Sequence, residues 1–230
     1  IADVLARMED IGMTLCIHGE VTDPAVDIFD REAVFIERVL APMRARHPGL
    51  KIVFEHITTE EAADYVMESG EGIAATITPH HLVISRNALF EGGLRPHHYC
   101  LPVAKRERHR LALRKAAVSG NPRFFLGTDT APHPRHAKES ACGCAGIYNA
   151  PAAIETYAQV FDDEGTLDRL EGFASLFGPA FYGLQPNTRR LKLERAPWRV
   201  PERVTVGNED GRSELTPFLA GCELAWRVAE

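Results

Sequence analysis

Short apolar segments alternate with helical segments along most of the chain. Apolar runs at 14–17, 51–56, 73–78 and 123–127 have the length and composition of buried strands. Residues 31–46, 105–118, 150–162 and 166–176 are predicted as helices, and Thr58 or Thr59 can cap a further helix between the second and third strands. Strands that are apolar on both faces and that alternate with helices predict a parallel sheet covered by helices.

Two architectures fit this alternation. Four strand–helix units make half of a (β/α)₈ barrel, which usually needs about 250 residues, and an open doubly wound sheet is the alternative. Neither a glycine-rich dinucleotide fingerprint nor a Walker motif is present, so nucleotide binding has no support. From about residue 187 the chain becomes rich in Arg and Pro, with short segments such as Val204-Thr205-Val206, which predicts an irregular or β-rich appendage.

The first residues already carry a helical pattern. Val4, Leu5, Met8 and Ile11 form an apolar stripe, and no capping or turn residue precedes it. A helix that begins at the first residue is typical of the middle of a longer protein, and we expect this sequence to be such a segment.

Composition narrows the class of protein. With 45% hydrophobic and 25% charged residues among 230, the chain is neither disordered nor collagen-like nor a coiled coil. Its net charge of −6 argues against a broad nucleic-acid or anionic-membrane surface. One basic segment is better explained as a solvated helix face, because Glu107 interrupts it and no aromatic residues are interleaved; it contains Lys105, Arg106, Arg108, Arg110, Arg114 and Lys115.

Cysteine usage and hydropathy point to a cellular compartment. The five cysteines are an odd number spread over a long chain, which is typical of reduced thiols in a reducing compartment. No apolar run approaches the roughly 20 residues that span a bilayer. We therefore expect a cytoplasmic protein.

Three of the four predicted strands end in a residue that can bind a metal ion. His18 and His56 follow the first two strands, and Asp129 follows the fourth. In parallel α/β folds the carboxyl ends of strands face a shared crevice, and two imidazoles with a carboxylate suit Zn²⁺ or a similar ion. The alternative is that each is an ordinary polar residue at a strand end.

The segment after the fourth strand is rich in candidate chemistry. His133 lies four residues beyond Asp129 in a proline-containing loop and can reach the same cavity. The small-residue loop Cys142–Gly146 fits no zinc-finger spacing, so flexibility and close approach to a ligand are its more plausible roles. The pairs His80-His81 and His97-His98 would face opposite sides of a strand, so we do not expect both members of either pair to be ligands.

Several longer motifs, in order, carry a resemblance to a known family. They are Ile17-His18-Gly19-Glu20-Val21, residues 54–59 (FEHITT), residues 75–79 (ATITP), Arg95-Pro96-His97 followed by residues 99–102 (YCLP), residues 127–133 (GTDTAPH) and residues 138–146 (KESACGCAG). Together they resemble the dihydroorotases of the shorter, bacterial type, over roughly residues 1 to 185.

The resemblance implies an amidohydrolase (β/α)₈ barrel with a two-zinc site. Such enzymes interconvert N-carbamoyl-L-aspartate and L-dihydroorotate in pyrimidine biosynthesis, and the family suggests a homodimer. The resemblance also implies that residues 1–185 form the C-terminal part of the barrel and that residues 186–230 form an appendage packed on it. By position, His18 and His56 resemble the ligands of the more exposed zinc, and Asp129 resembles a ligand of the other zinc that is also the general base and acid. His18, His133 and the backbone at Leu101 and Ala145 resemble the substrate-binding positions of the family.

Some features of the family are not found in this sequence. The His-x-His pair of the family's first strand and the bridging carboxylated lysine of its fourth strand cannot be placed. The chain therefore resembles strands five to eight, and we expect residues 1–230 alone to bind zinc poorly and to be inactive. Two alternatives stay open, namely another cyclic-amide hydrolase such as a hydantoinase or dihydropyrimidinase, and a non-catalytic homologue.

Overall fold

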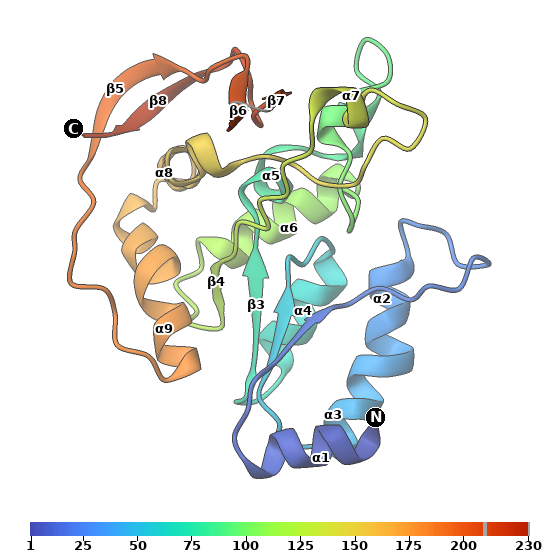
Figure 1. Cartoon of the computed structure of the whole chain (residues 1–230). Coiled ribbons are helices and arrows are strands. Elements are labelled where there is room, and N and C mark those ends of the chain that lie inside the picture. Colours follow the sequence, from blue (N-terminus) through green and yellow to red (C-terminus); the bar gives the residue numbers. More distant parts are fainter. Residues whose placement is uncertain (209–210, 230) are drawn as a thin grey trace.

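A parallel sheet of four strands forms the centre of the molecule. The computed structural model describes residues 1–208 and 211–229. The strands lie in the order of the sequence, and they are β1 (Leu15–His18), β2 (Ile52–Glu55), β3 (Ile73–Ile77) and β4 (Phe124–Leu126) (Figure 1). Leu15 pairs with Ile52, and Ala75 pairs with Phe124. All four predicted strands are confirmed, and His18 is the last residue of its strand rather than the first of a loop.

Helices follow the strands as predicted. They are α1 (Ala2–Asp10), α2 (Arg31–Phe35), α3 (Ala41–Arg46), α4 (Glu60–Glu68), α5 (Pro79–Val83), α6 (Glu107–Ala117), α7 (Arg135–Lys138), α8 (Ala153–Asp163) and α9 (Phe177–Tyr182). A π-helical turn at Ile36–Leu40 joins α2 to α3, so together they form the predicted helix 31–46. A second π-helical turn, Gly172–Leu176, leads into α9, so the helical segment predicted at 166–176 extends to Tyr182. The Thr59 side chain caps α4 by accepting a hydrogen bond from the Ala62 amide.

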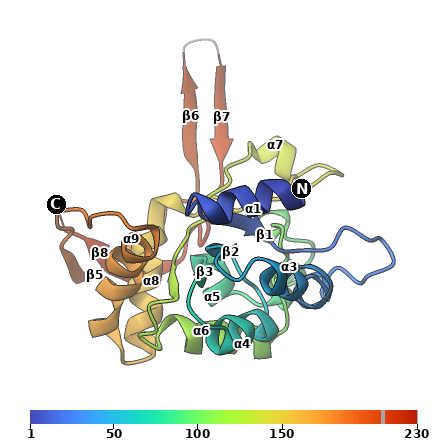
Figure 2. The ribbon, with the colours of Figure 1, turned by 90° about the horizontal axis from the view of Figure 1, so that it is seen from below.

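The two faces of the sheet pack against different parts of the chain. One face contributes Ile52, Phe54 and Ile73 to the main core. Helices that follow one another in an arc outside the strands pack against this face (Figure 2). The other face presents Val53, Ala74 and Phe125 to aromatic side chains at 177 and 181. Burial on both faces explains why the strands are uniformly apolar, and it leaves their carboxyl ends as the place for polar chemistry.

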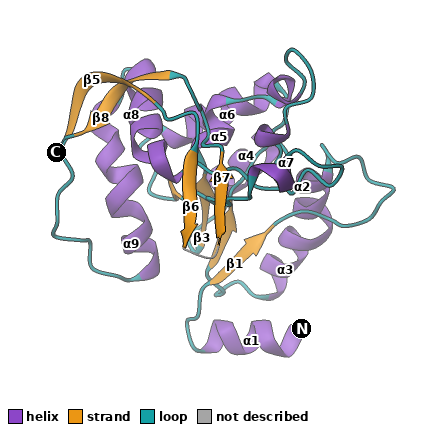
Figure 3. Cartoon of the chain, turned by 45° about the horizontal axis from the view of Figure 1, so that its top comes forward, coloured by secondary structure: helices purple, strands orange, loops and turns teal. Residues whose placement is uncertain are grey.

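The segment after α9 forms small antiparallel sheets. β5 (Leu193–Arg199) pairs with β8 (Glu223–Val228), and both lie beside α8 (Figure 3). β6 (Val204–Asn208) and β7 (Gly211–Leu215) form a hairpin that projects from the body (Figure 2). The β-rich character predicted for this region is confirmed. Residues 209, 210 and 230 belong to the predicted appendage but lie outside the described residues.

Two expectations about basic and histidine-rich segments are wrong. Lys105 precedes α6 instead of lying on its solvated face, and it is 4% exposed, with Nζ donating to the Val103 carbonyl at 2.9 Å. His80 and His81 lie on helix α5 rather than on a strand, because Thr78 caps the helix and Pro79 occupies its first turn. Within the described part of the chain, no helix has the length and apolar character needed to cross a membrane.

Candidate active site

His18 and His56 meet at the carboxyl edge of the sheet. β1 and β2 are parallel neighbours, with His18 paired to Glu55, the residue before His56. The two imidazole rings are in edge contact, with 4.8 Å between their centroids. The predicted convergence of these two histidines is thus observed, and it follows from the parallel register of the two strands.

The backbone of His56 is held in an unusual conformation. Its φ of +42° lies in the left-handed region, which a residue with a side chain adopts only when its surroundings fix it. The Thr76 hydroxyl on the neighbouring strand accepts a hydrogen bond from the His56 amide at 2.6 Å and donates to Glu55 at 2.7 Å. The strand end is therefore turned so that the imidazole leaves the line of the strand.

A buried carboxylate fixes the residues that follow His56. Glu32 of α2 is fully buried, and it accepts hydrogen bonds from the amides of Thr58 and Thr59 at 2.8–3.0 Å and from both of their hydroxyl groups. Burial raises the pKa of Glu32, and the positive charge of Lys105 opposes that shift. Charge-assisted hydrogen bonds of this kind are strong, so Glu32 anchors the turn between β2 and α4.

His18 is fixed by the loop that follows it. Its Nε2 lies 3.1 Å from Oε2 of Glu20, whose side chain is 7% exposed, and Lys105 Nζ lies 3.8 Å from the other Glu20 oxygen. Gly19 packs directly on the ring of Phe54, and a Cβ at position 19 would overlap that ring. The Glu20 contact leaves Nδ1 of His18 as the nitrogen available to a ligand.

Asp129 lies beyond the end of β4 and also has a left-handed backbone, with φ +43°. Gly127 permits the close approach of this segment to β3, because a Cβ there would lie 2.5 Å from Cβ of Thr76. Asn149 donates to the Thr128 carbonyl at 2.7 Å and so supports the turn. Partial burial raises the pKa of Asp129, and the charge of His18 opposes the shift.

The other predicted substrate-binding residues lie on two loops that contact each other. Nε2 of His133 lies 3.1 Å from the carbonyl oxygen of Ala145. The Gly146 amide donates to the Tyr99 carbonyl at 3.0 Å, which joins the Ala145 loop to the loop that carries Leu101. The structure thus joins His133 to the Ala145 loop and that loop to the segment that leads to Leu101.

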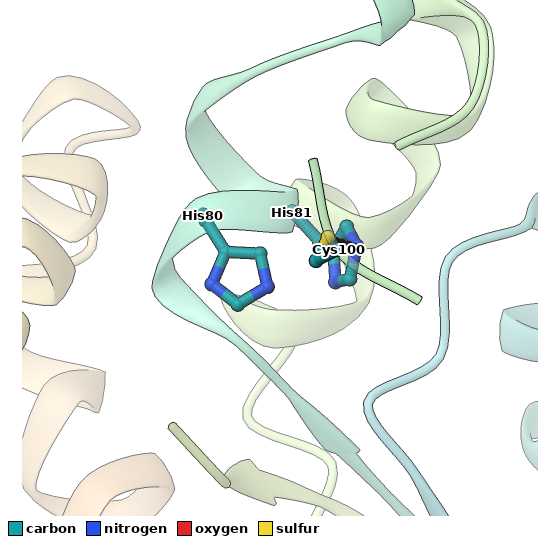
Figure 4. Close-up of side chains that lie close together, drawn as sticks. All are labelled: His80, His81 and Cys100. Atoms are coloured by element: carbon teal, nitrogen blue, oxygen red, sulfur yellow. Dashed lines mark hydrogen bonds between the residues drawn. The ribbon is translucent and has the colours of Figure 1, made fainter. Parts of the chain in front are cut away.

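A second histidine cluster lies behind this site. Among the described residues, His80, His81 and Cys100 form a buried group whose candidate ligand atoms all lie within 4.8 Å of one another (Figure 4). His81 uses both ring nitrogens: Nδ1 lies 2.8 Å from the Thr78 hydroxyl, and Nε2 lies 3.0 Å from the Pro102 carbonyl. Cys100 donates to the same carbonyl, and burial raises the pKa of its thiol to about 12. These bonds assign His81 and Cys100 to support of the 100–102 loop, whereas Nδ1 of His80 lies 3.0 Å from the side-chain nitrogen of Asn149.

The histidine pair fits a metal ion. Nδ1 of His56 is buried and has no hydrogen-bond partner among the described residues. Burial, and secondly the neighbouring His18, lower the pKa of His56 to about 4, so the ring is neutral at pH 7. A neutral imidazole with a vacant lone pair is the form that binds Zn²⁺. Among the described residues, Asp129 does not form a three-ligand group with this pair.

The sequence did not reveal the residues that support the site. Glu32 occupies a helix whose other charged residues are more exposed, and nothing in its neighbourhood distinguishes it from them. Lys138 was visible only as part of a family motif, although its ammonium is buried between loops. A sequence signal for the helix that carries His80 and His81 does exist, because Thr78-Pro79 is a typical helix start.

Comparison with known proteins gives one consistent result. The chain is 62% identical over 225 residues to a dihydroorotase of Aromatoleum aromaticum, covering 98% of the chain and 64% of that relative. It is 64% identical over 228 residues to a dihydroorotase of Parasynechococcus marenigrum, covering 99% and 64%. The crystal structure of dihydroorotase from Saccharomyces cerevisiae in complex with 5-fluoroorotic acid superposes with a TM-score of 0.86 at 32% identity, covering 98% of the chain and 65% of that structure. No family model matches the chain.

A hydantoinase shares the fold more distantly. The crystal structure of a D-hydantoinase has a TM-score of 0.73 at 15% identity, and it covers 99% of this chain and 57% of that structure. The four-stranded parallel sheet and its outer helices are therefore part of the amidohydrolase (β/α)₈ barrel, as expected, and the open doubly wound alternative is excluded. The chain spans about 64% of the length of the curated relatives that it matches. Over that span, the resemblance to the dihydroorotases is confirmed along nearly the whole chain.

Proposed function

We propose that the protein containing this chain is a zinc-dependent dihydroorotase, which interconverts N-carbamoyl-L-aspartate and L-dihydroorotate in pyrimidine biosynthesis. The observations that carry the proposal are the contact of His18 with His56 at the carboxyl edge of the sheet and the place of Asp129 just beyond the end of β4, in a chain 62–64% identical to dihydroorotases. The hydantoinase alternative has only a fold likeness at 15% identity in its favour.

In this proposal His18 and His56 hold one zinc ion, and Asp129 holds the second. Zinc lowers the pKa of water toward about 7 and polarises a carbonyl group, which is what hydrolysis of an unreactive cyclic amide requires. The low pKa of His56 keeps its ring unprotonated, and Glu20 orients His18 through its other nitrogen.

Asp129 acts as the general base and acid. In the hydrolytic direction it accepts a proton from the attacking water and delivers that proton to the ring nitrogen as the amide C–N bond breaks. In the cyclising direction the same carboxylate takes the proton from the carbamoyl nitrogen as the C–N bond forms and delivers it to the hydroxyl group that leaves as water. The pKa of Asp129 is raised by partial burial, which makes it a better proton acceptor than a solvated aspartate.

The substrate is an anion in both directions, and His18, Leu101, His133 and Ala145 are proposed to bind it. His133 is oriented by its contact with the Ala145 carbonyl, so its ring and the Ala145 backbone form one surface. The loop that carries Leu101 is joined to the Ala145 loop, because the Tyr99 carbonyl accepts a hydrogen bond from the Gly146 amide. Backbone groups fixed in this way suit an anionic substrate.

We further propose a division into residues 1–185, which contribute the barrel, and 186–230, which form an appendage on its outside. A homodimer in the cytoplasm is the proposed biological form.

The test uses the full-length product of the gene that encodes this chain, purified with zinc supplied. We expect hydrolysis of L-dihydroorotate, no comparable turnover of dihydrouracil or hydantoin, and bound zinc by metal analysis. Turnover of dihydrouracil in preference to dihydroorotate would assign the hydantoinase-type reaction instead. A protein that binds no zinc and turns over neither substrate would be a non-catalytic homologue.

A further inference from the structure

The ammonium group of Lys138 donates hydrogen bonds to three backbone carbonyl oxygens. The residue ends α7 and is 3% exposed. Its Nζ donates to the carbonyls of Tyr99 at 2.9 Å, Cys144 at 2.6 Å and Gly146 at 2.8 Å. A lysine ammonium has three N–H donors, so these three bonds use all of them.

These carbonyls belong to the two loops that carry the proposed substrate-binding backbone. Tyr99 lies two residues before Leu101, and Ala145 lies between Cys144 and Gly146. The Gly146 amide also donates to the Tyr99 carbonyl at 3.0 Å. Gly146 has φ +151°, and a Cβ there would lie 2.7 Å from the Ala131 carbonyl, so the loop also packs closely on the segment before His133.

Burial of an ammonium group carries a desolvation free energy that an apolar side chain of the same volume does not have. Burial lowers the pKa of Lys138 to about 8, while the thiols of Cys100 and Cys144 act in the opposite direction. The Tyr99 ring lies 5.6 Å from Nζ and adds a favourable cation–π contact. An apolar side chain would fill the same volume without the desolvation penalty, so the three directed bonds are what distinguishes this residue.

One of the three bonds acts on a proposed substrate-binding group. The Cys144 carbonyl and the Ala145 N–H belong to the same peptide unit. A cationic donor on the carbonyl polarises that peptide and makes its N–H a stronger donor. The effect favours an anion at Ala145 in the ground state and in the transition state alike.

We propose that Lys138 is a positioning residue for the anionic substrate: it joins the loops 99–101 and 144–146 and polarises the peptide that ends in the Ala145 N–H. This inference rests on the proposed dihydroorotase function. Because the carboxylate of the substrate does not change during the reaction, loss of Lys138 removes uniform binding, which raises KM and leaves kcat largely unchanged.

The experiment compares Lys138→Met with Lys115→Met in the full-length protein. Methionine keeps most of the volume and removes the three donors, and Lys115 is an exposed lysine on α6. We expect Lys138→Met to raise KM for dihydroorotate by about tenfold or more with kcat within about threefold, and Lys115→Met to change neither. Hydrogen–deuterium exchange is expected to increase in residues 96–104 and 139–149 and to stay unchanged in the β1–β4 strands.

The outcomes separate this inference from the proposed function. If the parent protein hydrolyses dihydroorotate and Lys138→Met leaves KM unchanged, the inference is overturned and the function stands. If the parent protein does not hydrolyse dihydroorotate, the proposed function fails, and a positioning role in substrate binding fails with it; the exchange data then report only whether Lys138 joins the two loops. If Lys138→Met does not fold, Lys138→Arg decides, because its planar fork keeps the charge but cannot reproduce three diverging bonds; an unchanged KM in that variant overturns the inference.

Discussion

The imidazole ring of His56 meets the ring of His18 edge-on, with 4.8 Å between centroids. Both rings come from strands that are direct neighbours, and each is fixed by a different polar side chain. Thr76 accepts from the His56 backbone, and Glu20 contacts the His18 ring. These contacts of the protein fix the backbone of His56 and the ring of His18.

Replacement of His56 by Ala is expected to lower the zinc content of the full-length protein by about one ion per site. The reason is that one imidazole alone is a weak site for zinc. Metal analysis after dialysis measures the effect, and His136→Ala, an exposed histidine in the same region as His133, is the control. Unchanged zinc in His56→Ala would remove His56 from the ligand set.

Asp129→Asn is expected to abolish turnover of dihydroorotate, with a loss of about a thousandfold or more, while the fold is kept. Asparagine has the same volume but cannot take up the proton of the attacking water. Steady-state kinetics and circular dichroism measure the two properties. The matched control is Asp168→Asn, at an exposed position in the turn before Leu170. Activity within about tenfold of the parent would contradict the assigned role.

His133→Ala is expected to weaken binding of the anionic substrate without loss of zinc. The half-buried ring contacts the Ala145 carbonyl at 3.1 Å and lies outside the histidine pair. KM is expected to rise by about tenfold while the zinc content stays at the parental value. A parallel fall in zinc content and affinity would make His133 a metal ligand instead.

Glu32→Gln is expected to lower the free energy of unfolding by about 2 kcal/mol, because an amide cannot accept all the hydrogen bonds that the carboxylate accepts. The amide group would also face the donors of Thr58 and Thr59. Urea denaturation measures the change, and Glu37→Gln at an exposed position of the same helical segment is the control. Equal stability of the two variants would show that the buried carboxylate is not an anchor.

Stability is expected to fall on acidification below about pH 6.5 because of the α5 histidines. Burial lowers the pKa of His80 to about 3 and that of His81 well below its usual value. Between these folded values and the unfolded value near 6.5, the unfolded chain binds more protons, so each histidine removes up to roughly 1.4 kcal/mol of stability per pH unit as the pH falls. Urea midpoints between about pH 7 and pH 5 measure the slope, which His80→Gln should reduce. An equal slope in both proteins would contradict this origin.

Much of the architecture could be predicted from the pattern of apolar residues. The strands ending near His18, His56 and Asp129 are uniformly apolar because both sheet faces are buried, and such short runs are hard to mistake for surface segments. Parallel strands bring their carboxyl ends to one edge, so the convergence of the two histidines followed from the strand assignment alone.

The supporting interactions could not be predicted because they depend on contacts between distant parts of the chain. Glu32 and Thr58 are 26 residues apart, and Lys138 and Tyr99 are 39 apart. A buried charged residue with its partners far along the sequence has the same local pattern as a solvated one. For this reason the sequence predicts a solvated face for Lys105, whereas the side chain is buried against Glu20 and the Val103 carbonyl.

The contact of Gly19 with the Phe54 ring has a consequence for how this sequence can change over time. An alanine at position 19 overlaps the ring, and a smaller side chain at 54 alone leaves a cavity in the core, so either single change is costly. Only a paired exchange, with a larger residue at 19 and a smaller one at 54, avoids both costs. Positions 19 and 54 are therefore expected to covary among related sequences. Substitution of the core residue Phe54 is thus restricted by the loop that presents His18.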